Sequence, residues 1–315
     1  MRYYFAPLEG LTDSIYRSLH HRFFGGIDRY YTPFLSPTVH RALTTREMRE
    51  LPKADSLGFS VVPQVLTKNA QDFLWLAGVC RDLGYREINL NLGCPSGTVT
   101  AKGKGSGMLR DLENLDRFLE EIFTDSPLPI SVKTRIGYEK AEEFADILTV
   151  YNRYPIAELT VHPRVRTAFY KGSVDMDAFR YALRESKAPL CYNGSLCTKE
   201  DIANIAYQFP QLQAVMLGRG LIADPGLFVP DGTTAETLEA FHDALLEAYI
   251  SAFGGERNAM FRMKENWRYW LCKFENAEKL GKQLRKTTDI REYRQITRQI
   301  FHTLPVKNTI MPDWD

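Results

Sequence analysis

The sequence predicts an α/β fold, namely a (β/α)8 TIM barrel followed by a small all-helical C-terminal domain. Short apolar runs typical of strands alternate eight times with helical spacing, about once every 25–30 residues. Polar side chains fall at or just beyond the ends of these runs, where a barrel of this kind carries its active site. After Pro230 only helical patterns follow. A doubly wound sheet is the structural alternative, but such a sheet rarely repeats so evenly.

Alternating or continuous apolar patterns predict the eight strands. They cover residues 3–7, 29–34, 59–66, 87–92, 129–135, 157–162, 189–194 and 214–220. Apolar spacing of three to four residues predicts the helices, the first of them capped by Thr12 or Asp13 and ending near residue 23. The others cover residues 41–53, 70–83, 112–123, 141–151, 177–184, 199–209, 237–253, 260–272, 275–285 and 291–304. We therefore expect a catalytic barrel domain over 1–232 and a helical domain over 233–315.

Composition places the chain among ordinary globular proteins. Of its 315 residues, 44% are hydrophobic and 25% charged. It has no run of about 18 apolar residues and no N-terminal apolar run long enough for a signal peptide, so we expect neither a membrane span nor a signal peptide. The five cysteines include no Cys-x-x-Cys pair, which argues against zinc, iron–sulfur and disulfide frameworks. We expect a monomer in a reducing cytoplasm.

Positive charge is concentrated in the predicted helical domain. Residues 256–302 hold 12 Lys and Arg against 6 Asp and Glu, a net charge of +6, whereas the whole chain carries +1. A basic helical module on a mildly acidic barrel indicates a polyanionic partner. A solvated helix surface explains the charge alone about equally well.

Residues 86–110 contain the most informative stretch. A short strand with Asn91 near its end leads into Gly93-Cys94-Pro95 and then into a loop with four further glycines. A thiol therefore follows a strand at the mouth of a glycine-rich loop, where parallel α/β proteins perform their chemistry. A single cysteine is more often a small buried hydrophobe. A polar, glycine-rich loop fits that alternative poorly, because loops lie on the surface.

The last two strands end in Asn193-Gly194-Ser195 and Gly218-Arg219-Gly220. Barrels of this class often bind phosphate after strands seven and eight, where backbone N–H groups and a helix N-terminus provide positive charge. Glycine allows a close approach of the backbone, and Arg219 can add a charge-assisted contact. The two motifs together indicate a phosphate-bearing cofactor.

Three further strand-end residues suit an anionic cofactor with a flavin ring. Lys133 and His162 come from neighbouring strands, and Lys133 could stabilise a reduced flavin, which carries negative charge. Gln64 offers an amide donor and acceptor to a ring edge. Each residue taken singly is explained equally well by a structural role. Lys133 could form a salt bridge, His162 could be a core histidine, and Gln64 could make a hydrogen bond at the barrel end.

Together these motifs resemble the tRNA-dihydrouridine synthase family. The matching segments occur in the family's order and are Ala6-Pro7-Leu8-Glu9-Gly10-Leu11-Thr12-Asp13, Asn91-Leu92-Gly93-Cys94-Pro95, Lys133-Thr134-Arg135, Val161-His162, Asn193-Gly194 and Gly218-Arg219-Gly220. The resemblance covers about residues 1–225, and the helical part matches in kind around 264–270. The Asn-x-Gly-Cys-Pro core is highly specific.

The resemblance implies an enzyme that uses FMN and NADPH to reduce selected uridines in tRNA to dihydrouridine. The positions that match FMN contacts are Pro7, Leu8 and Glu9 in a loop, Gln64, Lys133 and His162 at the ring and ribityl chain, and Asn193, Gly194, Ser195, Gly218 and Arg219 at the phosphate. Cys94 matches the catalytic acid. Asn91 and Arg135 match positions near the substrate base and its backbone.

The chain departs from the family pattern at three positions. Leu8 stands where Met is usual, a change that nearly conserves volume. Pro163 stands where Gly usually follows the histidine, which removes a backbone donor. Ser195 stands where an acidic residue is common.

The chemistry fits these residues independently. Saturation of the uracil 5,6 double bond requires a hydride at carbon 6 and a proton at carbon 5, and an acid on the face opposite the flavin must supply the proton. Cysteine has an ordinary pKa of ~8.5 and is mostly a thiol at neutral pH. A base inside folded tRNA must flip out to reach a barrel mouth.

Two alternatives remain open from the residues. A related flavin barrel acting on a free small molecule, such as a dihydroorotate dehydrogenase-like enzyme, shares the fold but leaves the basic helices unexplained. A non-catalytic tRNA-binding chaperone on a former enzyme scaffold would bind no flavin. Binding to tRNA would argue against the small-molecule enzyme, and flavin absorbance would argue against the non-catalytic chaperone.

Overall fold

A computed structural model describes residues 1–38 and 40–310, and it contains one parallel sheet. The strands are β1 (Arg2–Phe5), β2 (Arg29–Tyr31), β3 (Val61–Val62), β4 (Gln64–Val65), β5 (Ile88–Leu92), β6 (Ile130–Gly137), β7 (Leu159–Val165), β8 (Leu190–Asn193) and β9 (Ala214–Leu217). Their order is β3-β2-β1-β9-β8-β7-β6-β5-β4. Because β3 and β4 lie at opposite ends of this order and are joined in sequence by one residue, the sheet closes into a barrel.

Pro63 divides the third predicted strand into β3 and β4. Proline has no backbone N–H and interrupts a strand ladder. The segment from β2 to Leu35 nevertheless pairs with both halves. The Thr32 N–H donates to the Val62 carbonyl at 3.1 Å, and Leu35 pairs with Val65. The eight predicted strands and the (β/α)8 class are thus confirmed, with one strand interrupted.

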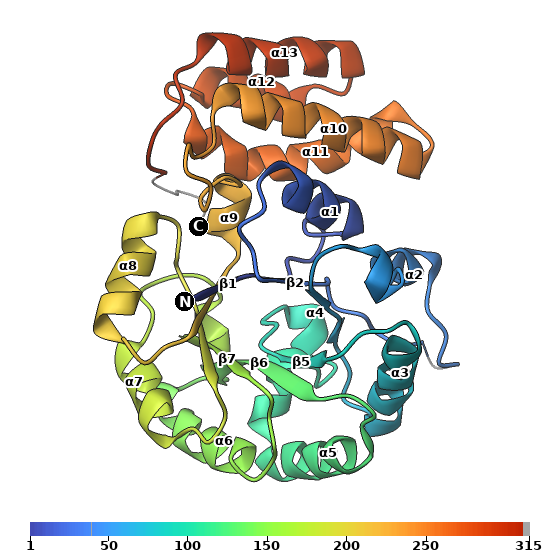
Figure 1. Ribbon diagram of the computed structural model, residues 1–315, viewed down its shortest axis with the longest axis vertical. Coiled ribbons are helices and arrows are strands. Elements are labelled where there is room, and N and C mark those ends of the chain that lie inside the picture. The colour runs from blue at the N-terminus through green and yellow to red at the C-terminus, as the bar shows by residue number, and fades with distance from the viewer. Residues whose placement is uncertain (39, 311–315) are drawn as a thin grey trace. The chain divides into compact units, whose positions relative to one another are not determined.

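The chain divides into two compact units. The first comprises Met1–Glu9, Asp28–Ser195 and Phe209–Met216 and holds nearly the whole sheet. Its helices are α2 (Thr45–Glu50), α3 (Ala70–Asp82), α4 (Gly97–Thr100), α5 (Leu112–Asp125), α6 (Phe144–Tyr151) and α7 (Met176–Glu185), with 3-10 turns η1 (Ala54–Ser56), η2 (Gly105–Arg110), η3 (Ala141–Glu143) and η4 (Arg166–Ala168). Figure 1 shows α3, α5, α6 and α7 outside the sheet, as a barrel requires.

Two segments of the first unit differ from the predicted elements. The helix expected over 41–53 is only α2, because Thr44 caps it in a capping box with Glu47 and Leu51 precedes a proline. The glycine-rich segment after Cys94 was expected to be a loop, but it forms α4 and η2. Residues 105–109 are buried, which anchors this segment to the barrel.

The second unit comprises Gly10–Ile27, Leu196–Gln208 and the chain from Leu217 onward. Its helices are α1 (Ser14–Phe23), α8 (Lys199–Gln208), α9 (Arg219–Ala223), α10 (Ala235–Phe253), α11 (Glu256–Trp270), α12 (Glu278–Lys286) and α13 (Ile290–Thr303), with the turn η5 (Leu271–Lys273). Asp13 caps α1, as predicted. The expected division into domains at residue 232 stays a prediction, and the compact units group α1, α8 and α9 with the four C-terminal helices.

An aromatic cluster forms the core of the C-terminal helices. Trp267 Nε1 donates to the Tyr293 hydroxyl at 2.9 Å, and His242 Nε2 lies 2.8 Å from the same oxygen. The Trp267 and Trp270 rings meet edge to face at 5.5 Å. These aromatic groups bury their apolar surface, and Trp267, His242 and Tyr293 pair their polar atoms, so the helices hold a core of their own. Within the described residues, none of the helices has the length and apolarity needed to cross a membrane.

Candidate active site at the carboxyl ends of the strands

Side-chain amides form a continuous network across β4, β5 and β6. Gln64 Nε2 donates to Asn89 Oδ1 at 2.8 Å, and Asn91 Nδ2 donates to Gln64 Oε1 at 2.8 Å. Asn89 Nδ2 in turn donates to Ser131 Oγ at 2.9 Å. Gln64 and Asn89 are fully buried, so each amide is held in one orientation by its partners. Asn89 was not predicted as part of the site, although strand alternation places it on the same face as Asn91.

Asn91 and Arg135 hold the turn that carries Cys94. Asn91 Oδ1 accepts hydrogen bonds from the Gly93 N–H at 3.1 Å and the Cys94 N–H at 2.9 Å. Arg135 Nε donates to the Gly93 carbonyl at 3.0 Å, and its Nη1 donates to the Val165 carbonyl at 2.9 Å. The structure therefore assigns both residues to the support of this turn. Their predicted contacts with the substrate base and its backbone stay predictions.

The segment η2 fixes Cys94 from its other side. The Ser106 N–H and Oγ both donate to the Cys94 carbonyl, at 3.2 and 2.7 Å. Gly105 has a φ of 57°, and a Cβ there would lie 3.0 Å from the Cys94 Cβ. Only glycine fits this close approach and this backbone conformation. Sequence reasoning noticed the glycines but missed Ser106, because its partner lies 12 residues away.

The Cys94 thiol is half-buried, and this burial raises its pKa. A hydrogen bond from the Ser96 backbone and the charge of Arg135 oppose the rise without cancelling it. Cys94 therefore carries its proton at neutral pH, since an ordinary cysteine pKa already lies above 7. A protonated thiol can act as an acid, whereas a nucleophilic cysteine requires a lowered pKa.

Lys133 and Asn193 meet across the barrel end. Lys133 Nζ donates to Asn193 Oδ1 at 2.7 Å, and Asn193 Nδ2 donates to the Met216 carbonyl at 2.7 Å. Burial, reinforced by the charge of Arg135, lowers the pKa of Lys133 to about 8. A partly desolvated ammonium hydrogen-bonded to a neutral amide is suited to pair with an incoming anionic group.

Arg164 joins His162 to Ser195. Its Nη1 lies 3.0 Å from His162 Nε2, and its Nη2 donates to Ser195 Oγ at 2.8 Å. A guanidinium can only donate, so His162 Nε2 is the acceptor and the ring proton lies on Nδ1. Gly194 lies beside the ring, where a Cβ would be 3.4 Å from His162 Cδ2. Sequence reasoning missed Arg164, although it stands two residues after His162 and so on the same face of β7.

The remaining predicted residues lie in two places. Pro7 and Leu8 follow β1 and are half-buried, and Glu9 forms an ion pair with Arg46. Gly218 and Arg219 belong to the second unit, where Arg219 begins α9. Their roles at a cofactor stay predictions.

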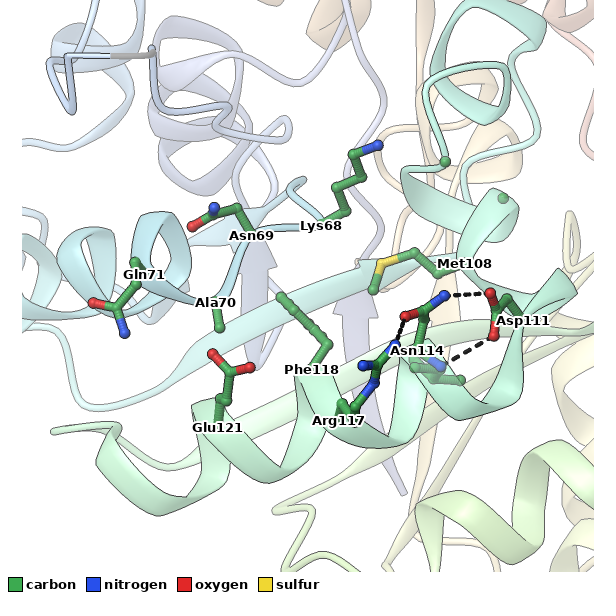
Figure 2. Close-up of a pocket in the computed structure, with 13 residues that line it drawn as sticks. Lys68, Asn69, Ala70, Gln71, Met108, Asp111, Asn114, Arg117, Phe118 and Glu121 are labelled. Carbon is green, nitrogen blue, oxygen red and sulfur yellow. Dashed lines mark hydrogen bonds between the residues drawn. The ribbon is translucent and has the colours of Figure 1, made fainter.

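A separate pocket of about 580 Å³ lies in the first unit next to the Cys94 segment. It is lined by residues of α3, η2 and α5, and by Lys68, Asn69, Gly103 and Asp111. Figure 2 shows Asn114 between Asp111 and Arg117, joined to both by hydrogen bonds. The pocket includes none of the predicted site residues.

The barrel and the polar groups near its strand ends place the chain in the class of TIM-barrel enzymes. A variant of morphinone reductase in complex with tetrahydroNAD shares this fold, with a TM-score of 0.51, 11% identity, and coverage of 72% of this chain and 85% of that one. The family model described as "Dihydrouridine synthase (Dus)" matches residues 4–309. The chain therefore belongs to the dihydrouridine synthase family.

Curated relatives agree with this family. A probable tRNA-dihydrouridine synthase of Rhizobium leguminosarum bv. phaseoli is 27% identical over 310 residues, which cover 95% of this chain and 94% of the relative. The tRNA-dihydrouridine synthase B of Proteus vulgaris is 27% identical over 224 residues, which cover 71% of this chain and 68% of the relative.

Proposed function

We propose that the protein reduces the uracil 5,6 double bond of specific uridines in tRNA, with FMN as its flavin and NADPH as the reductant. Family membership and the names of the relatives support this reaction. The single observation that carries it is the geometry of Cys94, a protonated thiol held on both sides at the carboxyl end of β5.

The residues present fit a flavin mononucleotide. Bound FMN would supply the hydride for carbon 6. Lys133 presents a half-buried cation to a group that gains negative charge, and Gln64 presents an amide that its neighbours hold in place. Gly194 packs closely against its neighbours, because a Cβ there would meet Val174 Cγ1 at 3.0 Å. Asn193 and Ser195 are the proposed phosphate ligands of the first unit, and the phosphate roles of Gly218 and Arg219 stay predictions from the sequence.

Cys94 holds the proton at Sγ and would deliver it to carbon 5. Its backbone cannot shift easily, because Asn91 fixes its N–H and Ser106 fixes its carbonyl. Such fixed placement lowers the barrier to proton transfer, because the acid need not reorganise. The uridine must leave its stack to reach this thiol.

The basic helices would bind the tRNA backbone. Exposed cations on α11 and α12 include Arg268, Lys282 and Arg285. Contacts between such cations and phosphates provide salt-dependent affinity that is independent of sequence.

Reduction of tRNA by the purified protein tests the proposal. Transfer RNA from a strain that lacks this gene is incubated with the flavin-loaded protein and NADPH, and dihydrouridine is mapped by mass spectrometry. We expect dihydrouridine at defined positions that are unmodified in the starting tRNA. Reduction of free uracil or of another free pyrimidine, with no change in tRNA, would favour the small-molecule alternative. A colourless protein that binds tRNA without reducing it would favour the chaperone.

A further inference from the structure

Four side chains of the first unit alternate as cation and aromatic ring. The guanidinium of Arg110 lies 4.8 Å from the centre of the Tyr138 ring, and that of Arg166 lies 5.3 Å from the same ring. Arg166 also lies 5.0 Å from the centre of the Phe169 ring. We call Arg110, Tyr138, Arg166 and Phe169 the arginine–aromatic ladder. Cation–π contacts of this kind hold the planes of the groups against one another.

The ladder is attached to the segment that carries Cys94. Arg166 Nε donates to the Pro95 carbonyl at 3.1 Å, and its Nη2 donates to Thr100 Oγ1 at 3.2 Å. Tyr170 follows Phe169 directly, and its ring centre lies 6.1 Å from that of His162. One end of the ladder therefore borders the candidate active site.

Phe169 ends the ladder in an unusual state. The residue stays 41% exposed, and its backbone has a φ of 50° and a ψ of −104°. A positive φ is uncommon for a bulky residue and persists only where the surroundings impose it. If the ladder served only to pack two loops together, burial of this ring would be the expected result. Instead, the backbone is held in a strained conformation while the aromatic surface remains in water.

We propose that the exposed face of Phe169 stacks an unpaired base of the tRNA next to the uridine that is reduced. This inference rests on the proposed function and adds a substrate contact to it. Flipping one uridine unstacks its neighbours, and an aromatic ring can replace the lost stacking contact for any base. Arg110 and Arg166 place positive charge beside that base. This charge can attract the phosphates on either side of the stacked nucleotide.

Replacement of the ring tests the proposal. Phe169→Leu keeps an apolar side chain but removes the flat face, whereas Phe169→Trp keeps a face. Loss of one stacked base lowers affinity by roughly 5- to 150-fold. We expect Phe169→Leu to raise the tRNA dissociation constant by a factor in this range, and Phe169→Trp to stay close to wild type. Fluorescence anisotropy without NADPH measures binding, so the result does not depend on whether the tRNA is reduced.

Tyr207→Leu is the matched control, because Tyr207 is an aromatic residue on α8 that is 88% exposed and belongs to no ladder. It should leave tRNA affinity and dihydrouridine formation unchanged. The melting temperature of each variant shows whether it is folded.

A substrate change identifies the stacked group. A tRNA that lacks the base on one side of the reduced uridine should bind wild type more weakly, and Phe169→Leu should weaken it no further. An equal effect of Phe169→Leu on intact and abasic tRNA would overturn the proposal, as would an unchanged dissociation constant for intact tRNA. If wild type forms no dihydrouridine while the binding difference persists, the proposed function fails and the stacking surface stands; abasic sites are then placed singly at each unpaired position of the bound tRNA.

Discussion

Lys133 Nζ donates to Asn193 Oδ1 at 2.7 Å and so links two residues that are 60 positions apart in sequence. The contact joins β6 and β8, which lie on either side of β7 in the sheet. It provides a half-buried lysine with a neutral partner, because the amide oxygen satisfies one of its donors. The same arrangement makes the charge of Lys133 sensitive to pH.

The affinity for FMN should fall as the pH rises through about 8, the lowered pKa of Lys133. Below this pKa the ammonium is charged and attracts an anionic cofactor, and above it the amine is neutral. Asn193→Asp places a carboxylate beside Lys133, raises its pKa and should move the midpoint to higher pH. Flavin fluorescence quenching over about pH 6.5 to 9.5 measures the dissociation constant. Lys133→Met should bind FMN weakly and without this midpoint, and an unchanged profile would remove Lys133 from the site.

Cys94→Ala should retain flavin but lose most of its turnover with tRNA. The variant keeps the backbone bonds of residue 94 and removes only the proton donor. Loss of a general acid costs about 10²–10⁴-fold in rate. Single-turnover formation of dihydrouridine measures this, with flavin absorbance as the check on cofactor content. Cys272→Ala, a half-buried thiol among the C-terminal helices, is the matched control and should react like wild type. Wild-type rates for Cys94→Ala would exclude it as the acid.

Charge reversal at Arg268, Lys282 and Arg285 should weaken tRNA binding and leave flavin absorbance unchanged. These side chains are exposed, so their charge is free to meet phosphates. Each lost phosphate contact should lower the slope of log affinity against log salt by roughly 0.7–0.9. Lys187→Glu is the control. Lys187 is exposed and lies on the loop before β8, at the amino end of the strands, whereas the candidate site lies at their carboxyl ends. Equal salt slopes for all variants would mean that these helices do not bind tRNA.

Lys264 is a different case among the cations of the helical region. Its Nζ donates to the carbonyls of Arg285 and Thr287 at the end of α12, so it supports that helix. Reversal of this charge should lower the melting temperature and is therefore unsuitable as a test of docking.

Tyr4→Phe should lower the free energy of unfolding by about 1–3 kcal/mol, because it removes a hydrogen-bond donor from a buried carboxylate. The Tyr4 hydroxyl donates to Glu158 Oε2 at 2.9 Å inside the barrel, and Glu158 is 4% exposed. Burial raises the pKa of Glu158. Removal of the donor destabilises the charged carboxylate most, so the deficit should shrink as the pH falls and Glu158 is protonated. Urea unfolding at several pH values measures the difference, and a deficit that is constant with pH would contradict this account.

The sequence by itself determined the barrel, and it predicted a site among the polar residues near the strand ends. Strand alternation and helical spacing are local properties, so the eight strands could be predicted along with the polar residues that follow them. Resemblance to a family then assigned roles to these residues. The structure places Asn193 at the end of β8, whereas Lys133 and His162 lie within β6 and β7, which continue to Gly137 and Val165. The roles of all three residues at a cofactor stay predictions.

Only the tertiary structure decided what each polar atom contacts. Asn91 was expected to face a substrate, yet both of its amide atoms are used, one by Gln64 and the other by the Cys94 turn. Arg164 and Ser106 were missed because their partners Ser195 and Cys94 lie 31 and 12 residues away. Such pairings depend on the register between strands and on closure of the barrel, and no local pattern in the chain encodes either of them.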